Sequence, residues 1–144
     1  MTNTLTRLAA ALATSLTLAS AHAVTVDEVV GTYAVTGLRT EMFQLDGYWK
    51  LRSLTISGTV TLNADGTMRG SLVDAGSQME AGGAATVFNS VKEPLKAKWK
   101  IIDDRTLLLG GNRFNLGAGY QVMTSAQANE SDHSNSVITL LRQP

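Results

Sequence analysis

Apolar and polar residues alternate along several short stretches of this chain. In residues 54–62 every large apolar side chain stands at an even-numbered position, with Thr or Ser between them. A period of two is the pattern of a β-strand that buries one face. The pair Asp65-Gly66 follows, and such a pair supplies the positive backbone φ that a tight hairpin turn needs. The chain then returns with Met68 and Leu72 on the inward face, so a hairpin is predicted here.

The same alternation predicts strands over most of the remaining chain. Lys alternates with Ala97, Trp99 and Ile101, which places three ammonium groups on one face and the apolar side chains on the other. No amphipathic helix of useful length follows residue 30, and residues 26–30 are compatible with one helical turn. Short strands at this spacing predict an all-β fold, a single antiparallel β-barrel of seven or eight strands in a meander-like order. Strands are predicted at residues 32–38, 54–62, 67–72, 96–101, 106–109 and 137–141, with weaker candidates at 84–90, 113–116 and 120–125.

Two stretches allow more than one interpretation. Residues 40–50 hold five large apolar side chains around Asp46-Gly47. They form either a second hairpin between two long strands or an apolar loop over one end of the barrel, and the Asp-Gly pair favours the hairpin. Residues 125–136 are polar apart from two small alanines, so a mobile loop is expected there before the closing strand.

The first 23 residues have the pattern of a secretory signal peptide. Arg7 supplies the positive charge, residues 8–20 are uncharged, and Ala21-His22-Ala23 has the small-x-small form of a cleavage site. The uncharged run is shorter than the roughly 20 residues that cross a bilayer core as a helix. The sequence therefore predicts a protein exported to the periplasm or the extracellular space, with a domain at 24–144 and no membrane span.

Composition narrows the classes of function. The chain has 12 basic and 12 acidic residues, so it lacks the basic excess that nucleic-acid binding needs. It contains no cysteine, which excludes disulfides, thiolate metal sites and cysteine nucleophiles. An exported domain of this kind relies on packing and strand pairing alone.

Catalytic machinery is hard to find in the sequence. His133 lies between carboxylates and serines, but neighbouring residues of one loop do not converge on a point unless the backbone folds them inward. Asp103-Asp104 falls in a predicted turn, whereas a glycosidase pair must face across a cleft. We expect no catalytic residue, metal or cofactor, with a His133-dependent activity as the minor alternative.

The two ends of the predicted barrel resemble those of the calycin superfamily, in particular small bacterial lipocalin-like β-barrels. In that group a short helical turn precedes Gly-x-Trp on the first strand, and a basic residue on the last strand packs across the Trp. Here Gly31-Thr32-Tyr33 occupies the first position and Arg142 the second. The resemblance implies a lipocalin-like barrel whose interior holds a small ligand.

The barrel interior is the remaining candidate site. It is either a filled core or a pocket for a small hydrophobic or amphiphilic molecule, and eight strands permit both. The alternative to a ligand carrier is a protein-interaction module of the cell envelope, an inhibitor or an assembly accessory with a filled core. The residues predicted to bind a ligand are Tyr33, Phe43, Tyr48, Trp49, Ile56, Val60, Met68 and Trp99.

Overall fold

Antiparallel strands make up most of the part of the chain that the structure describes. The computed structural model describes residues 23–80, 83, 85–91, 94–130 and 133–144, so the predicted signal peptide lies outside the described residues except for Ala23. The elements are α2 (Val26–Val29), β1 (Gly31–Leu45), β2 (Tyr48–Leu62), β3 (Thr67–Glu80), β4 (Thr86–Val91), β5 (Leu95–Asp103), β6 (Thr106–Leu109), β7 (Asn112–Leu116), the 3-10 turn η1 (Ala118–Tyr120), β8 (Val122–Asn129) and β9 (Ser134–Arg142).

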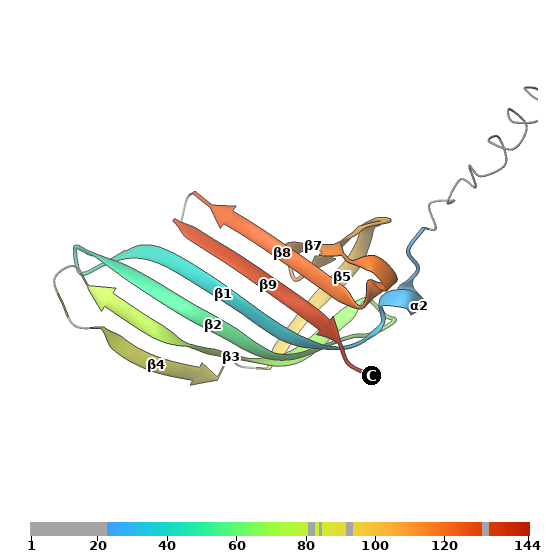
Figure 1. Ribbon diagram of the computed structural model, residues 1–144, viewed down its shortest axis with the longest axis horizontal. Coiled ribbons are helices and arrows are strands. Elements are labelled where there is room, and N and C mark those ends of the chain that lie inside the picture. Colours follow the sequence, from blue (N-terminus) through green and yellow to red (C-terminus); the bar gives the residue numbers. More distant parts are fainter. Residues whose placement is uncertain (1–22, 81–82, 84, 92–93, 131–132) are drawn as a thin grey trace, which may run out of the picture.

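Eight of these strands close into a barrel. The hydrogen-bonded order is β2-β1-β9-β8-β7-β6-β5-β3, and pairing of β2 with β3 completes the ring. Strand β4 is additional and pairs with the far half of β3 (Figure 1). This confirms the predicted single antiparallel barrel, which is compatible with a lipocalin-like fold.

Both predicted Asp-Gly hairpins are present. Asp46 and Gly47 have φ of 54° and 80°, and Leu45 pairs with Tyr48, so the two long strands β1 and β2 meet in a two-residue turn. At the second turn the Asp65 carboxylate accepts a 2.9 Å hydrogen bond from the Thr67 amide. Residues 40–50 are therefore a hairpin, and the alternative of an apolar loop is excluded.

The prediction of a loop at residues 125–136 is wrong. Strand β8 continues to Asn129 and β9 begins at Ser134, in unbroken antiparallel register. The polar side chains of Ser125, Gln127 and Asn129 stand at alternate positions, with Ala126 and Ala128 between them. A strand that carries polar side chains on its inward face lacks the apolar period by which strands are identified, and so it resembles a loop.

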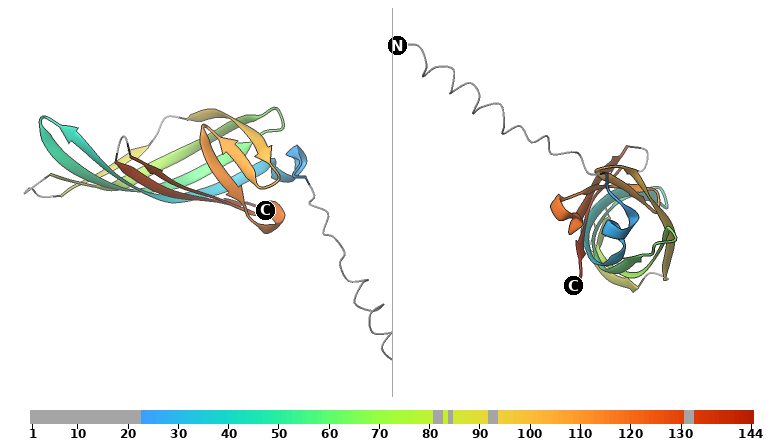
Figure 2. Two further views of the ribbon diagram at one scale, coloured as in Figure 1. Left: turned by 90° about the horizontal axis from the view of Figure 1, so that it is seen from above. Right: turned by 90° about the vertical axis from the view of Figure 1, so that its right-hand side faces the viewer.

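One end of the barrel is covered by α2 and by contacts between the first and last strands. Tyr33 is completely buried, and its hydroxyl donates a 2.7 Å hydrogen bond to the Val29 carbonyl oxygen. The Arg142 guanidinium donates 2.6 Å hydrogen bonds to the carbonyl oxygens of Glu28 and Val30. Figure 2 shows α2 lying across this end of the barrel. The apolar core gathers just inside it.

The wall of the barrel has unequal height. Strands β1 and β2 have 15 residues each, whereas β6 has four and β7 has five. At about 3.3 Å per residue, the long strands reach far beyond the β6–β7 turn at Gly110. The β1–β2 hairpin accordingly extends away from the α2 end (Figures 1 and 2). The interior is thus accessible above the short strands.

Candidate functional site

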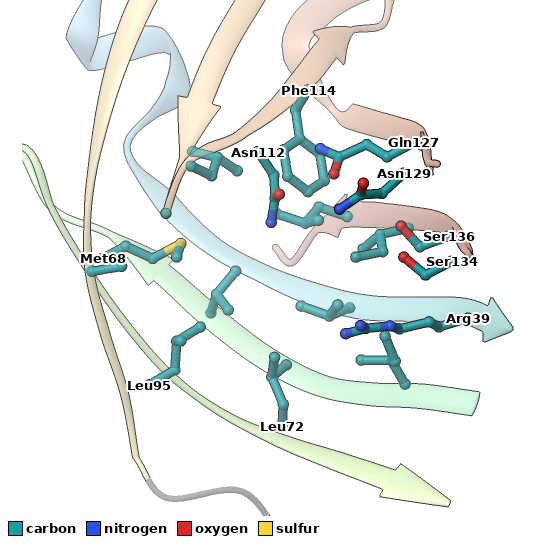
Figure 3. A pocket seen from close by; sticks show the side chains of 18 residues that line it. Arg39, Met68, Leu72, Leu95, Asn112, Phe114, Gln127, Asn129, Ser134 and Ser136 are labelled. Carbon is teal, nitrogen blue, oxygen red and sulfur yellow. The ribbon is translucent and has the colours of Figure 1, made fainter. Parts of the chain in front are cut away.

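A cavity of about 450 Å³ occupies the interior above the core. In Figure 3 the polar side chains labelled at the right come from one side of the cavity, and the apolar Met68, Leu72 and Leu95 lie opposite them. Among its described lining residues, Arg39 alone is charged. The lining consists of Val35, Arg39, Ile56, Val60, Met68, Leu72, Leu95, Ala97, Leu109, Gly110, Asn112, Phe114, Gln127, Asn129, Ser134, Ser136, Ile138 and Leu140.

Strand register changes the chemistry of the wall with depth. Across β1, β9 and β8, the deepest inward-facing row of paired residues is the apolar set Val35, Leu140 and Met123. Two residues higher on each strand the row becomes mixed, with Gly37, Ile138 and Ser125. The wall therefore turns from apolar to polar towards the open end.

Two polar rows lie above this mixed level. The first consists of Arg39, Ser136 and Gln127, and the second of Glu41, Ser134 and Asn129. The Gln127 side-chain amide donates a 3.3 Å hydrogen bond to the Ser125 hydroxyl, which holds it against the wall. We refer to these six residues as the polar rows. In Figure 3 the amides of Gln127 and Asn129 lie on one side of Ser134 and Ser136, and Arg39 lies on the other side, on the neighbouring strand.

The charges at the open end form a connected group. Glu41 accepts from Arg39 Nη2 at 2.7 Å through one oxygen and from Arg52 Nη1 at 3.0 Å through the other. Arg52 also donates to the Gln78 side-chain oxygen at 3.0 Å, and its Cζ lies 4.6 Å from the centre of the Phe43 ring. One carboxylate thus serves two guanidinium groups, and the Arg39 side chain is still 38% exposed.

The predicted ligand-binding residues divide into three groups. Ile56, Val60 and Met68 line the cavity. Tyr33 and Trp99 are buried in the core and do not line it; the Trp99 indole donates a 2.9 Å hydrogen bond to the Asn63 carbonyl oxygen.

The three aromatic residues of the β1–β2 hairpin form the third group, which lies outside both the cavity lining and the core. Phe43 is half-buried beneath Arg52, while Tyr48 and Trp49 are exposed near the tip, with 66% and 48% of their surfaces accessible. These three residues are absent from the cavity lining.

Arg39 and the polar rows were not identified from the sequence. The first strand was predicted to end at Leu38, yet the period of two that places Tyr33 and Val35 inward continues through Arg39 and Glu41. Counting onward by two residues from the inward-facing Val35 would have placed both charged side chains inside the barrel. The same count backward from Ile138 reaches Ser136 and Ser134.

The remaining observations concern His133, metal binding and membrane spans. His133 is exposed at the β8–β9 turn, where its ring lies edge-on to Trp49 with centroids 5.7 Å apart. Within the described ranges no three His, Asp or Glu side chains gather in a manner that could hold a metal ion. No helix in that part of the chain has the length and apolar character to cross a membrane.

Burial and hydrogen bonding shift the pKa values of Tyr33, Asp65 and Asp103, which lie outside the cavity lining. Burial raises the pKa of Tyr33, and the positive charge of Arg142 offsets part of that effect. Hydrogen bonds from Thr67 lower the pKa of Asp65, and the Arg105 amide does the same for Asp103. Tyr33 lies at the closed end of the barrel, and Asp65 and Asp103 lie at two turns between strands.

Comparisons with known proteins add no family to this description. The chain matches no protein-family model, and searches of the curated proteins and of the solved structures find no match.

Proposed function

We propose that residues 24–144 form an exported, lipocalin-like carrier of the calycin type, which binds one small amphiphilic molecule inside the barrel without chemical change. The observation that carries this proposal is the cavity of about 450 Å³. Ligand pockets typically measure roughly 300–1,000 Å³ and combine apolar walls with a few converging polar groups. A filled core would leave no such space.

The graded wall supports an amphiphile rather than a purely apolar molecule. An apolar tail would bury against side chains such as Ile56, Leu72 and Phe114, at about 25 cal/mol for each Å² removed from water. A polar head would meet the polar rows. A ligand polar at both ends would leave the lower wall without matching contacts, and burying an unsatisfied polar group is costly.

Export is a separate part of the proposal. It rests on the signal-peptide pattern of residues 1–23. Expression of the full chain in a bacterial host, followed by mass measurement of the protein from the periplasm, tests it. A mature mass that begins at Val24 supports export, whereas an unprocessed chain in the cytoplasm contradicts it.

The ligand proposal is tested by native mass spectrometry of residues 24–144. The expected result is a reproducible extra mass that denaturation releases. Titration with an apolar dye supplies the second measurement, with the tryptophan emission as the readout. A bare mass together with no dye binding would contradict the carrier function.

An envelope protein-interaction module is the second candidate. One observation favours it: near the tip of the β1–β2 hairpin, Leu45, Tyr48, Trp49 and Leu51 are all at least 44% exposed. Exposed apolar clusters of this kind often mark protein contacts. Replacing Tyr48 and Leu45 with Ser should abolish capture of a partner from an envelope extract if this function holds, and should leave dye binding unchanged if the carrier function holds.

A further inference from the structure

The placement of Arg39 narrows the chemistry of the head group. Its guanidinium is the one charged group among the described residues that line the cavity. It stands in the first polar row beside Ser136 and Gln127, above the mixed row of Gly37, Ile138 and Ser125. A head group anchored to an apolar tail would come to lie at this level.

We propose that the ligand is a single-chain amphiphile with an oxyanion head, a carboxylate or a phosphate, and that Arg39 is its counter-ion. This rests on the proposed function, because it assigns the ligand of the same cavity. The head displaces Glu41 from Arg39, and the side chains of Ser136 and Gln127 donate to its remaining oxygens.

The geometry of the charges makes this displacement inexpensive. Glu41 binds Arg39 and Arg52 through different oxygens, so it keeps the Arg52 contact when Arg39 turns to the ligand. A guanidinium presents several N–H donors in a plane and can accept two oxygens side by side. No carboxylate is left without a cation by the exchange.

A cationic or neutral head fits the same place less well. A cation would be brought next to Arg39, and the carboxylate that contacts Arg39, Glu41, is already shared by two guanidinium groups. A neutral hydroxyl would gain ordinary hydrogen bonds, which are weaker than charge-assisted ones. The other buried charged residues of β2 and β3, Lys50 and Asp74, do not line the cavity.

The test compares four amphiphiles with one common tail, below their micelle thresholds. These are dodecanoate, dodecyl phosphate, dodecanol and dodecyltrimethylammonium, each titrated into residues 24–144 and followed by calorimetry. We expect at least one anion to bind about ten-fold or more tighter than dodecanol. The order of the two anions then distinguishes a carboxylate source from a phosphate source.

Three variants locate the effect. Arg39→Gln should reduce the affinity for the anion about ten-fold and leave the affinity for dodecanol unchanged. Glu41→Gln should raise the affinity for the anion, because it removes the competing carboxylate. Arg69→Gln is the matched control, since Arg69 is exposed on β3 and outside the cavity.

The outcomes separate this inference from the function on which it rests. Binding of none of the four probes would overturn both. Equal binding of the anions and dodecanol would overturn the oxyanion head and leave the carrier function standing. A lower affinity for every probe in Arg39→Gln, accompanied by a lower melting temperature, would also overturn the assignment, because Arg39 would then act on the fold.

Discussion

Arg142 donates a 2.6 Å hydrogen bond to the carbonyl oxygen of Glu28, a residue 114 positions earlier in the chain. A second bond of equal length reaches Val30, so a single side chain satisfies two carbonyl oxygens around the end of α2. Helix ends leave such carbonyls without helical partners, and a cation near them is favourable. The last strand thereby holds the short helix over the barrel end.

Replacing Arg142 with Ala should therefore destabilise the protein. Two hydrogen bonds from a charged donor are lost, and the expected decrease in the free energy of unfolding is about 3 kcal/mol. Urea denaturation followed by circular dichroism measures it. Arg113→Ala, at an exposed position of β7, is the control and should change stability by less than about 0.5 kcal/mol. Equal stability of the two variants would contradict this role for Arg142.

The raised pKa of Tyr33 predicts a loss of stability in alkaline solution. Because folding favours the protonated phenol, its contribution is fully present below the ordinary tyrosine pKa of about 10 and declines as the pH rises above it. Melting temperatures between pH 8 and 11 test this. Tyr33→Phe has no proton to lose at this position, so its melting temperature should fall less steeply above pH 10. Parallel curves for both proteins would show that other groups cause the loss.

A side chain at Gly58 should not be tolerated. Gly58 has φ of +147°, and an added Cβ would collide with the carbonyl oxygen of Ser71 on the neighbouring strand. Since backbone must shift to relieve this contact, Gly58→Ala should cost about 3 kcal/mol. Gly111→Ala has open space around it and a φ of +94°, so strain alone should cost about 1 kcal/mol. Chemical denaturation of both variants provides the comparison.

Filling the cavity should lower the affinity for a ligand without lowering the stability of the fold. Leu72→Phe adds volume inside the cavity, so dye affinity should fall about ten-fold or more while the melting temperature stays the same or rises. Leu38→Phe places the same ring on the outer surface, where Leu38 is 61% exposed, and should alter neither quantity. Unchanged dye affinity in Leu72→Phe would place the dye elsewhere.

Much of the fold could be predicted from the sequence because most strands bury one apolar face. The periods around Ile56 and Trp99 are clear, and the two Asp-Gly pairs define the hairpins on either side of β2. The family resemblance predicts that Arg142 packs across the ring of Tyr33, whereas the contacts that define its position are hydrogen bonds from the guanidinium to backbone carbonyls at the α2 end. The local sequence pattern was sufficient to identify a strand wherever its inward side chains are apolar.

The site was harder to predict for the same physical reason. At the open end the inward positions are polar, so Gln127 and Asn129 resembled a loop and Arg39 fell beyond the predicted strand. The sequence pattern favours the aromatic residues of the β1–β2 hairpin instead, because they are large and apolar. Which face of a strand is inward depends on pairing with distant strands, and single-strand patterns do not report it.

The pairing of β1 with both β2 and β9 has a consequence for the order of folding. A chain that emerges from a ribosome or a translocation pore with its N-terminus first can form the β1–β2 hairpin early, since the two strands are adjacent in sequence. The seam between β1 and β9 has to wait until Arg142 has emerged. Contacts between such distant segments make folding slow. The ring therefore closes only after residue 142 has emerged, and until then the edge of β1 that pairs with β9 stays uncovered.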